Sequence, residues 1–162
     1  MKFKLEIKWG IIFIGMSLLW MFFEKAMGWH SVRIEDQAIY TNLFAIPAIL
    51  VYVLAFQDKR KRDAGPMQWK HGFFFGLGMT IVITLFSPLS QWIVSELISP
   101  EYFPNVINYV VSQGEMTQEA AEDYFSLSNY IVQSTVFALL MGIVTSAIVA
   151  LFIRKKTPEI LG

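Results

Sequence analysis

Four long apolar stretches, separated by polar segments, dominate the pattern of hydrophobic and polar positions in this chain of 162 residues. They cover about residues 9–27, 38–56, 72–94 and 129–153, and none has a charged residue in its central part. A helix rises about 1.5 Å per residue, so each stretch has roughly the length that crosses the hydrocarbon core of a bilayer. The pattern predicts an all-α fold: a single transmembrane domain over 1–162, built as a four-helix bundle.

Composition agrees with a membrane protein. Hydrophobic residues make up 55% of the chain and charged residues 16%, whereas a soluble domain carries about 25% charge. The formal net charge is zero, so no global electrostatic attraction to nucleic acid is expected. The chain has no cysteine, which excludes disulfides, thiolate metal sites and cysteine nucleophiles.

The basic residues indicate which segments share one side of the membrane. Eleven of the thirteen Lys and Arg residues precede the first stretch, join the second to the third, or follow the fourth. The positive-inside rule therefore places both termini in the cytoplasm. The run expected to determine this topology is Lys59, Arg60, Lys61 and Arg62, supported by Lys2, Lys4, Lys8, Lys70, Arg154, Lys155 and Lys156.

The first stretch has weak features of a cleaved signal peptide, but Glu24 and Lys25 fit a cleavage site poorly. It also resembles the third stretch, because Lys8–Ser17 reads like Lys70–Thr80 with one residue inserted. We expect a retained helix. The chain is then either a tandem repeat of a two-helix hairpin or shows a chance similarity between apolar segments.

The second outer loop, about residues 99–128, predicts two short amphipathic helices. Pro104 suits the start of a helix that ends near Gly114, and Thr117 suits the N-cap of the next helix. This segment is acidic and has no basic residue. Its acids Glu119, Glu122 and Asp123 share a helical face, which either holds a divalent cation or is simply solvated.

Small residues recur every four positions in the third and fourth stretches. Such ridges let helix backbones approach closely in a membrane, where packing drives association. The contact lies either inside one bundle or between copies of the chain. The helix-packing residues predicted from these ridges are Gly72, Gly76, Ala138, Gly142 and Ser146.

The sequence predicts no catalytic, cofactor-binding or metal-binding residue, and no cofactor. His30 and His71 are expected on opposite sides of the bilayer, so they cannot share a metal. Glu24 is expected near the outer headgroups, about 22 Å along the helix from Trp9, where a charged side chain can snorkel to water. A buried Glu24 would instead indicate function.

Polar residues near Pro88 and in the outer part of the fourth stretch form one further candidate site. They either line a small polar cavity toward the outer leaflet, or satisfy kinked backbone and neighbouring helices. The residues concerned are Ser87, Ser90, Gln91, Gln133 and Thr135.

Several short motifs carry a resemblance to a known family. They are Gly10 and Gly15, the segments Ser99–Phe103 and Gln113–Thr117, and Met141-Gly142-Ile143 leading to Arg154-Lys155-Lys156. The chain resembles small four-span bacterial membrane proteins of Gram-negative envelopes, catalogued only as a domain of unknown function. The resemblance implies a location in the bacterial cytoplasmic (inner) membrane, and it supplies no reaction, ligand or site residue.

Three classes of function remain from the sequence. The favoured one is a non-enzymatic membrane protein that acts through helix packing, in a homo-oligomer or with an unidentified membrane partner. The alternative is a small-solute transporter or channel subunit, indicated by the repeat and by the hydroxyl-bearing helices with internal prolines. An intramembrane enzyme is the least supported class, because the sequence shows no pair of nucleophile and base.

Overall fold

The computed structural model describes residues 3–63 and 66–154, and its regular structure in that part of the chain is entirely helical. Four helical units are long and apolar enough to cross a membrane: Lys4–Ala26, Ile34–Asp63, Trp69–Ile98 and Leu127–Ile153. The predicted all-α bundle is therefore confirmed. The predicted topology residues Lys2, Lys155 and Lys156 lie outside the described residues.

Two of the four units contain more than one kind of helix. In chain order the elements are α1 (Lys4–Ala26), α2 (Ile34–Tyr40), the 3₁₀-helix η1 (Thr41–Phe44), α3 (Ala45–Asp63), α4 (Trp69–Ile93), the π-helix η2 (Val94–Ile98), α5 (Tyr102–Ser112), α6 (Gln118–Tyr124) and α7 (Leu127–Ile153). Two units are continuous through these changes of helix type: α2–η1–α3 and α4–η2. A change in the number of residues per turn alters the direction in which the following side chains point.

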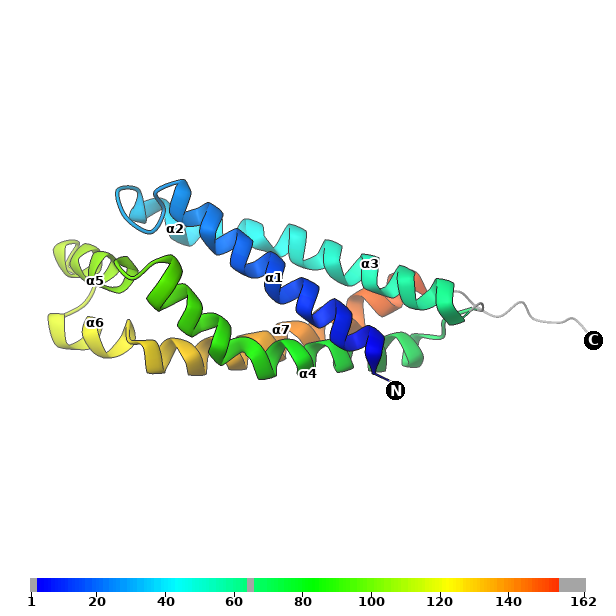
Figure 1. The fold of residues 1–162 in the computed structure, drawn as a ribbon. Coiled ribbons are helices and arrows are strands. Elements are labelled where there is room, and N and C mark those ends of the chain that lie inside the picture. The colour runs from blue at the N-terminus through cyan, green and yellow to red at the C-terminus, as the bar shows by residue number, and fades with distance from the viewer. Residues whose placement is uncertain (1–2, 64–65, 155–162) are drawn as a thin grey trace, which may run out of the picture.

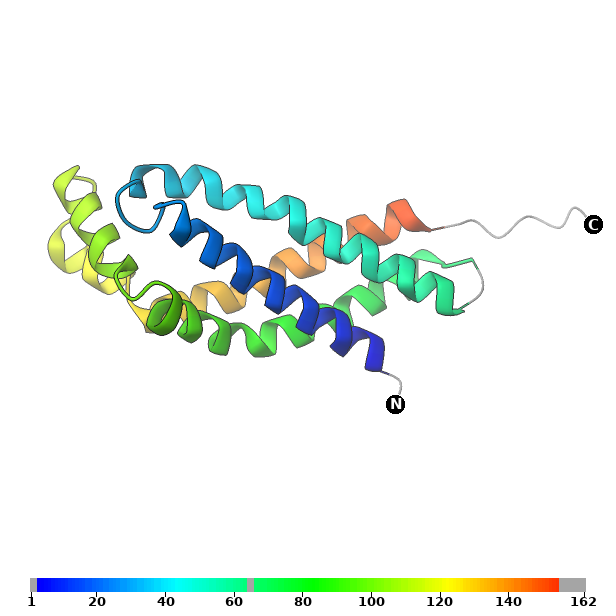
Figure 2. The ribbon, with the colours of Figure 1, turned by 45° about the horizontal axis from the view of Figure 1, so that its top comes forward.

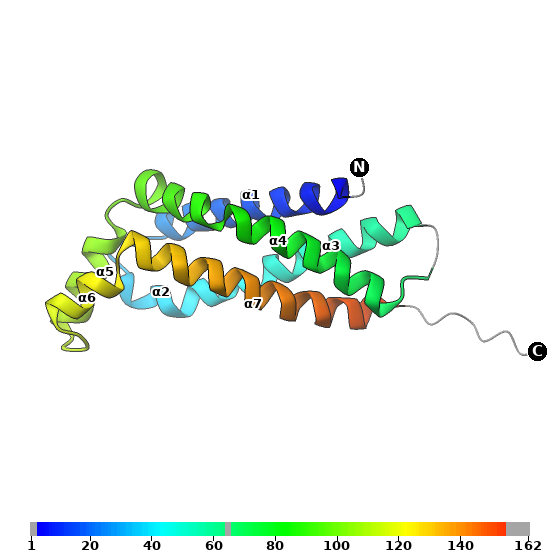
Figure 3. The same cartoon turned by 90° about the horizontal axis from the view of Figure 1, so that it is seen from below.

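The long helices run along one axis, and the short helices gather at one end (Figure 1). We call the end at which α1 begins and α7 ends the base of the bundle, and the opposite end the loop end. Figure 2 shows α1 and α3 joined at the loop end, and Figure 3 shows α4 and α7 side by side with α5 and α6 at the loop end. The basic run thus lies at the base and the acidic helices at the loop end.

The second helical unit is longer than the sequence predicted. It begins at Ile34 and continues to Asp63, so it includes the whole basic run. Lys and Arg are good helix formers, and two ion pairs with i, i+4 spacing, Arg62–Asp58 at 3.0 Å and Lys59–Asp63 at 3.1 Å, support the last turns. The helix therefore continues past the end of the predicted membrane span at residue 56, because helix formation extends beyond the apolar stretch.

The short helices at the loop end follow local signals. Gly114 has φ +73° after α5, which is the left-handed conformation that favours glycine, and the Thr117 hydroxyl accepts from the Ala120 N–H at 3.3 Å as the N-cap of α6. The helix α5 begins at Tyr102 rather than at Pro104. Val106, Val110 and Ala121 are buried and pack α5 and α6 against each other.

A compact apolar core fills the base half of the bundle. Phe56 and Phe75 pack edge to face, with ring centroids 5.4 Å apart, and Met79 and Ala55 are fully buried beside them. Many large apolar side chains elsewhere point outward, such as Phe152, Leu85 and Leu19, which are 72–81% exposed. Outward-facing apolar residues of this size are what a bilayer accommodates and water does not.

The predicted helix-packing residues lie where α4 meets α7. A Cβ built at Gly142 would meet the side chain of Thr80, and one built at Gly76 would meet Ser146 and Phe56. One built at Gly72 would lie 3.1 Å from the Cβ of Ala150. Ala138 is half-buried and packs against the core, so all five predicted residues lie in packed positions within one chain.

Candidate functional site

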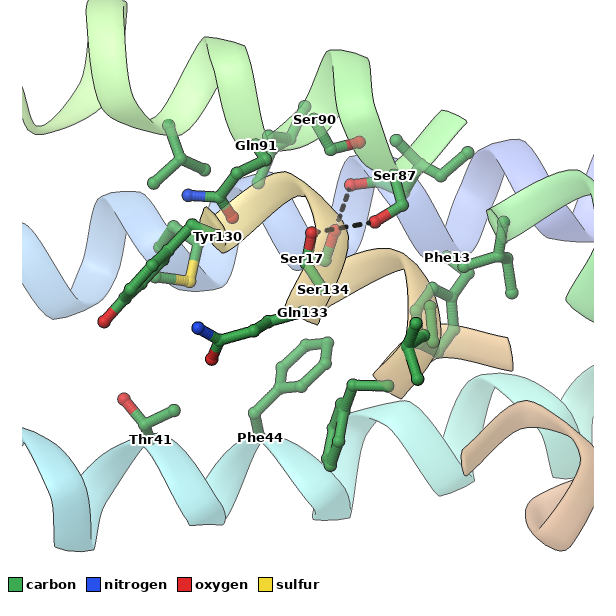
Figure 4. A pocket seen from close by; sticks show the side chains of 18 of the residues that line it. Phe13, Ser17, Thr41, Phe44, Ser87, Ser90, Gln91, Tyr130, Gln133 and Ser134 are labelled. Carbon is green, nitrogen blue, oxygen red and sulfur yellow. Dashed lines mark hydrogen bonds between the residues drawn. The ribbon is translucent and has the colours of Figure 1, made fainter. Parts of the chain in front are cut away.

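A cavity of about 840 Å³ occupies the loop half of the bundle, beyond the packed core. Side chains from α1, η1, α4 and α7 surround it, as Figure 4 shows for Ser17, Thr41, Gln91 and Gln133. Its deeper wall is apolar and aromatic, and its polar groups gather toward the loop end. Small-molecule sites in proteins commonly have this volume and combine a mainly apolar wall with a few polar side chains.

Four of the five residues predicted from the sequence to line a polar cavity do so. Ser87, Ser90 and Gln91 reach it from α4, and Gln133 reaches it from α7. Thr135 does not line it, and its hydroxyl donates to the backbone carbonyl of Ile131 at 2.7 Å. Ser17, Thr41 and Ser134 were missed, since only the tertiary structure brings their helices to the same space.

The serine hydroxyls of the cavity already donate to protein acceptors. Ser17 donates to the Ile14 carbonyl at 2.8 Å, and Ser90 donates to the Phe86 carbonyl at 3.0 Å. Ser87 donates to Ser134 at 3.2 Å, and Ser134 donates in turn to the carbonyl of Ile131. A hydroxyl has one proton, so these four side chains can offer a ligand only acceptor positions.

The glutamine amides keep more hydrogen-bonding capacity. Gln133 makes no side-chain hydrogen bond within the described part of the chain and projects into the cavity (Figure 4). Gln91 donates one N–H to the Ser95 hydroxyl at 3.2 Å, which leaves its second N–H and its carbonyl oxygen. An amide has two donors and an acceptor, so both residues can give and accept hydrogen bonds.

At the loop end the wall of the cavity rests on a buried cluster around Glu24. The side chain of Glu24 has no exposed surface, so the prediction that it snorkels to water was wrong. The reason is tertiary: Thr41 of η1 and His30 of the loop after α1 contact the carboxylate at the end of α1. Its carboxylate accepts from Trp20 Nε1 at 2.5 Å, from the Thr41 hydroxyl at 2.9 Å and from His30 Nε2 at 3.1 Å.

His30 connects this carboxylate to the segment that follows η2. The Nε2–H of His30 donates to Glu24. In the neutral imidazole Nδ1 is then an acceptor, and the Ser99 hydroxyl donates to Nδ1 at 2.6 Å. The His30 carbonyl accepts from the Asn105 side chain at 2.9 Å. Glu24, His30, Ser99 and Asn105 thus tie α1 and the first loop to η2 and α5, and we call this set the clasp.

Local backbone geometry brings the clasp together. Gly28 has φ +81° after α1, and the turn it makes returns the chain so that His30 lies against Glu24, only six residues earlier. On the other side, the N–H of Ser99 donates to the Val94 carbonyl at 2.7 Å, which closes the last turn of the π-helix. Single π-helical turns inside helices are frequent at functional sites.

Two tyrosines complete the loop-end wall. The rings of His30 and Tyr102 lie 5.1 Å apart, and the hydroxyls of Tyr102 and Tyr130 are hydrogen-bonded at 3.2 Å. Burial raises the pKa of the Tyr102 phenol, which keeps it in the uncharged form. Tyr102 therefore contributes a neutral hydroxyl at this end of the cavity.

The clasp has the order of groups found in serine hydrolases, namely hydroxyl, imidazole and carboxylate. Its surroundings differ from those of a nucleophile. Ser99 is only 4% exposed, and the next residue is Pro100, which has no backbone N–H to stabilise an oxyanion. The arrangement is better suited to holding two segments together than to attacking a substrate.

The acidic face of α6 shows no sign of a cation site. Glu119, Glu122 and Asp123 are exposed, and Glu122 accepts from the Gln118 amide at 2.6 Å. Within residues 3–63 and 66–154, no group of three His, Asp or Glu side chains is placed to hold a metal ion.

Fold and cavity together define a helical membrane protein with four helices able to span a bilayer and an amphipathic cavity in one half. The chain belongs to the family described as "Protein of unknown function (DUF4199)", whose family model matches residues 8–155. No curated protein and no solved structure matches the chain.

Proposed function

We propose that this membrane protein binds a small amphipathic molecule of the bilayer in its loop-half cavity, and that it acts as a binding protein rather than an enzyme. The observation that carries this proposal is the cavity itself. Its volume of about 840 Å³ lies within the range of about 300–1,000 Å³ typical of small-molecule sites. Its wall is mostly apolar, with hydrogen-bonding side chains such as Ser87, Gln91 and Gln133 among the lining residues.

The wall along α7 provides a route of entry from the membrane. Val132, Val136, Phe137 and Leu140 line the cavity, and each is 51–65% exposed. Side chains that line a cavity and also face outward leave it accessible from the surrounding acyl chains. A ligand that is already dissolved in the bilayer can therefore reach the cavity sideways, between the helices.

The distribution of charge supports an orientation for this binding site. The basic residues at the base favour that end on the cytoplasmic side, with both termini inside. In this orientation the cavity lies in the half of the protein that faces the outer leaflet. The family resemblance favours the bacterial inner membrane as its location. Three of the four residues of the basic run have partners in the protein: Lys59, Arg60 and Arg62.

Solute transport is a second candidate function, favoured by the asymmetry of the bundle. The cavity occupies the loop half, while Phe56, Phe75 and Met79 fill the base half. A carrier open toward one side has this arrangement. The hypothesis of a homo-oligomer gains no support from the small-residue ridges, because these residues are occupied between α4 and α7 of one chain.

Photo-crosslinking in lipid nanodiscs tests the proposed binding. A monoacylglycerol with a diazirine in its chain should label cavity residues, identified by mass spectrometry. Ser17→Trp should reduce this labelling severalfold, because Ser17 lines the cavity and the indole would occupy it. Leu19→Trp is the matched control, since Leu19 is 72% exposed on the same helix. Equal labelling of the two variants would refute binding in the cavity.

A further inference from the structure

The chemistry of the cavity wall restricts the head group that it can accept. No Lys, Arg, Asp or Glu side chain is among the residues that line it. A charged head group moved from water into this space would lack an ion-pairing partner, and an unpaired buried charge is strongly unfavourable. The wall therefore discriminates against the charged lipids that make up much of a bilayer surface.

The clasp strengthens this discrimination against both signs of charge. The Glu24 carboxylate lies directly behind His30 and repels an anionic head group at the loop end. A cationic head group gains nothing from it, because Glu24 has no exposed surface and both its oxygens already accept hydrogen bonds. Both ring nitrogens of His30 are also occupied, by Glu24 and Ser99.

What the wall offers is three amides. Gln37 on α2 donates one N–H to the Thr41 hydroxyl at 3.1 Å, which leaves its second N–H and its carbonyl oxygen. Gln91 on α4 and Gln133 on α7 both reach the cavity, and between them they keep free N–H donors and carbonyl acceptors. The serine hydroxyls add acceptor positions only. A head group that carries both hydroxyl and carbonyl groups complements such a set, since it can donate to the amide oxygens and accept from the amide N–H groups.

We propose that Gln91 and Gln133, together with Gln37, form a head-group site selective for uncharged lipids that carry hydroxyl and ester carbonyl groups, of the acylglycerol type. The inference rests on the proposed binding function and adds the class of ligand. The head group lies beside these amides. The acyl chain lies along the apolar wall formed by Phe13, Ile83 and Phe137.

Three probes with the same chain and different head groups test this selectivity. Monooleoylglycerol is uncharged, oleate is anionic and oleylamine is cationic, and each competes with the diazirine probe for labelling of the cavity in nanodiscs. Monooleoylglycerol should compete about tenfold more strongly than either charged probe, which is the effect of one or two hydrogen bonds. Equal competition by oleate or oleylamine would overturn the proposed selectivity.

Variants of Gln133 connect the selectivity to the amides. Gln133→Leu should remove the preference for monooleoylglycerol, and Gln133→Glu should shift it toward oleylamine because the new carboxylate pairs with the amine. Gln57→Leu, at an exposed position on α3 near the base, should keep the wild-type preference. An unchanged preference in both Gln133 variants would refute the assignment.

The outcomes separate this inference from the function on which it rests. If none of the three probes competes and the cavity residues are not labelled, the proposed binding itself is wrong. If all three compete equally, the cavity binds chains without reading the head group, and only the amide site is wrong.

Discussion

Gly76 gives the sharpest test of how the bundle is held together. A Cβ added at this position would lie 2.5 Å from the Ser146 hydroxyl oxygen, 2.6 Å from the Ser146 Cβ and 2.9 Å from Cζ of Phe56. Real Cβ atoms essentially never approach other atoms so closely. Ser146 and Phe56 are fully buried, so neither can move aside without disturbing its own contacts. Gly76→Ala must therefore force α4 away from α7.

The magnitude follows from the cost of an overpacked interior. Inserting a methyl group into a well-packed core typically costs about 1–3 kcal/mol. Gly15→Ala is the matched control, because nothing lies within 4 Å of a Cβ built at Gly15, which is also in a helix. There the substitution removes an unfavourable glycine and gains up to about 1 kcal/mol. The two variants should thus differ by about 1–4 kcal/mol in the free energy of unfolding.

Unfolding in mixed micelles, titrated with sodium dodecyl sulfate and followed by circular dichroism, measures this difference. Light scattering of the folded samples should show the same particle mass for both variants, because the contact lies within one chain. If Gly76→Ala and Gly15→Ala unfold at the same detergent fraction, close packing of α4 on α7 is refuted. A change of mass only in Gly76→Ala would instead indicate a contact between copies.

Two further predictions concern the clasp and the orientation. Glu24→Ala leaves three donors without their acceptor and should lower the free energy of unfolding by about 3 kcal/mol or more. The control Glu35→Ala, at an exposed position of α2, should change it by less than about 0.5 kcal/mol. Equal values for the two variants in the same detergent titration would contradict a buried carboxylate. The chain has no cysteine, so Lys61→Cys and Gln118→Cys each introduce a single thiol. A membrane-impermeant maleimide added to intact spheroplasts should label only Gln118→Cys, and the reverse pattern would overturn the proposed orientation.

The fold was predictable because the strongest signal in a membrane protein is local. Each span is recognisable from its own apolar length, with no knowledge of its neighbours. The short helices also carried local signals, in Gly114 and Thr117. The helix continues past the predicted span at residue 56 because an apolar stretch indicates where lipid can surround a helix, while ion pairs and helix propensity decide where the helix ends.

The candidate site was predictable only where its residues are neighbours in sequence. Ser87, Ser90 and Gln91 lie close together on α4 and pointed to a cavity. The clasp had no comparable signal, since His30 and Ser99 are 69 positions apart. Glu24 was assigned to the interface from its distance along one isolated helix, and the cover that buries it comes from other segments.

The base half of the bundle is packed and the loop half holds a cavity because the two halves have side chains of different size. In the base half, Gly76, Gly142 and Ser146 let α4 and α7 approach closely, and large side chains such as Phe56 fill what remains. In the loop half, small hydroxyl residues such as Ser17, Ser87 and Ser134 face the cavity, and aromatic side chains line its wall without filling it. We infer that contacts at the loop end are needed to hold the helices apart around this space.

The clasp fulfils this requirement. Burying Glu24 and His30 is costly, and an apolar contact of similar volume would stabilise a simple bundle at least as well. An apolar contact lacks the directional geometry of hydrogen bonds. The Glu24 oxygens accept from α1, η1 and His30, and His30 accepts from Ser99, so these hydrogen bonds fix where each segment lies. A polar cluster of this kind at the end of a cavity fixes the spacing of α1 and α5, and the proposed ligand would then enter a cavity that is already open.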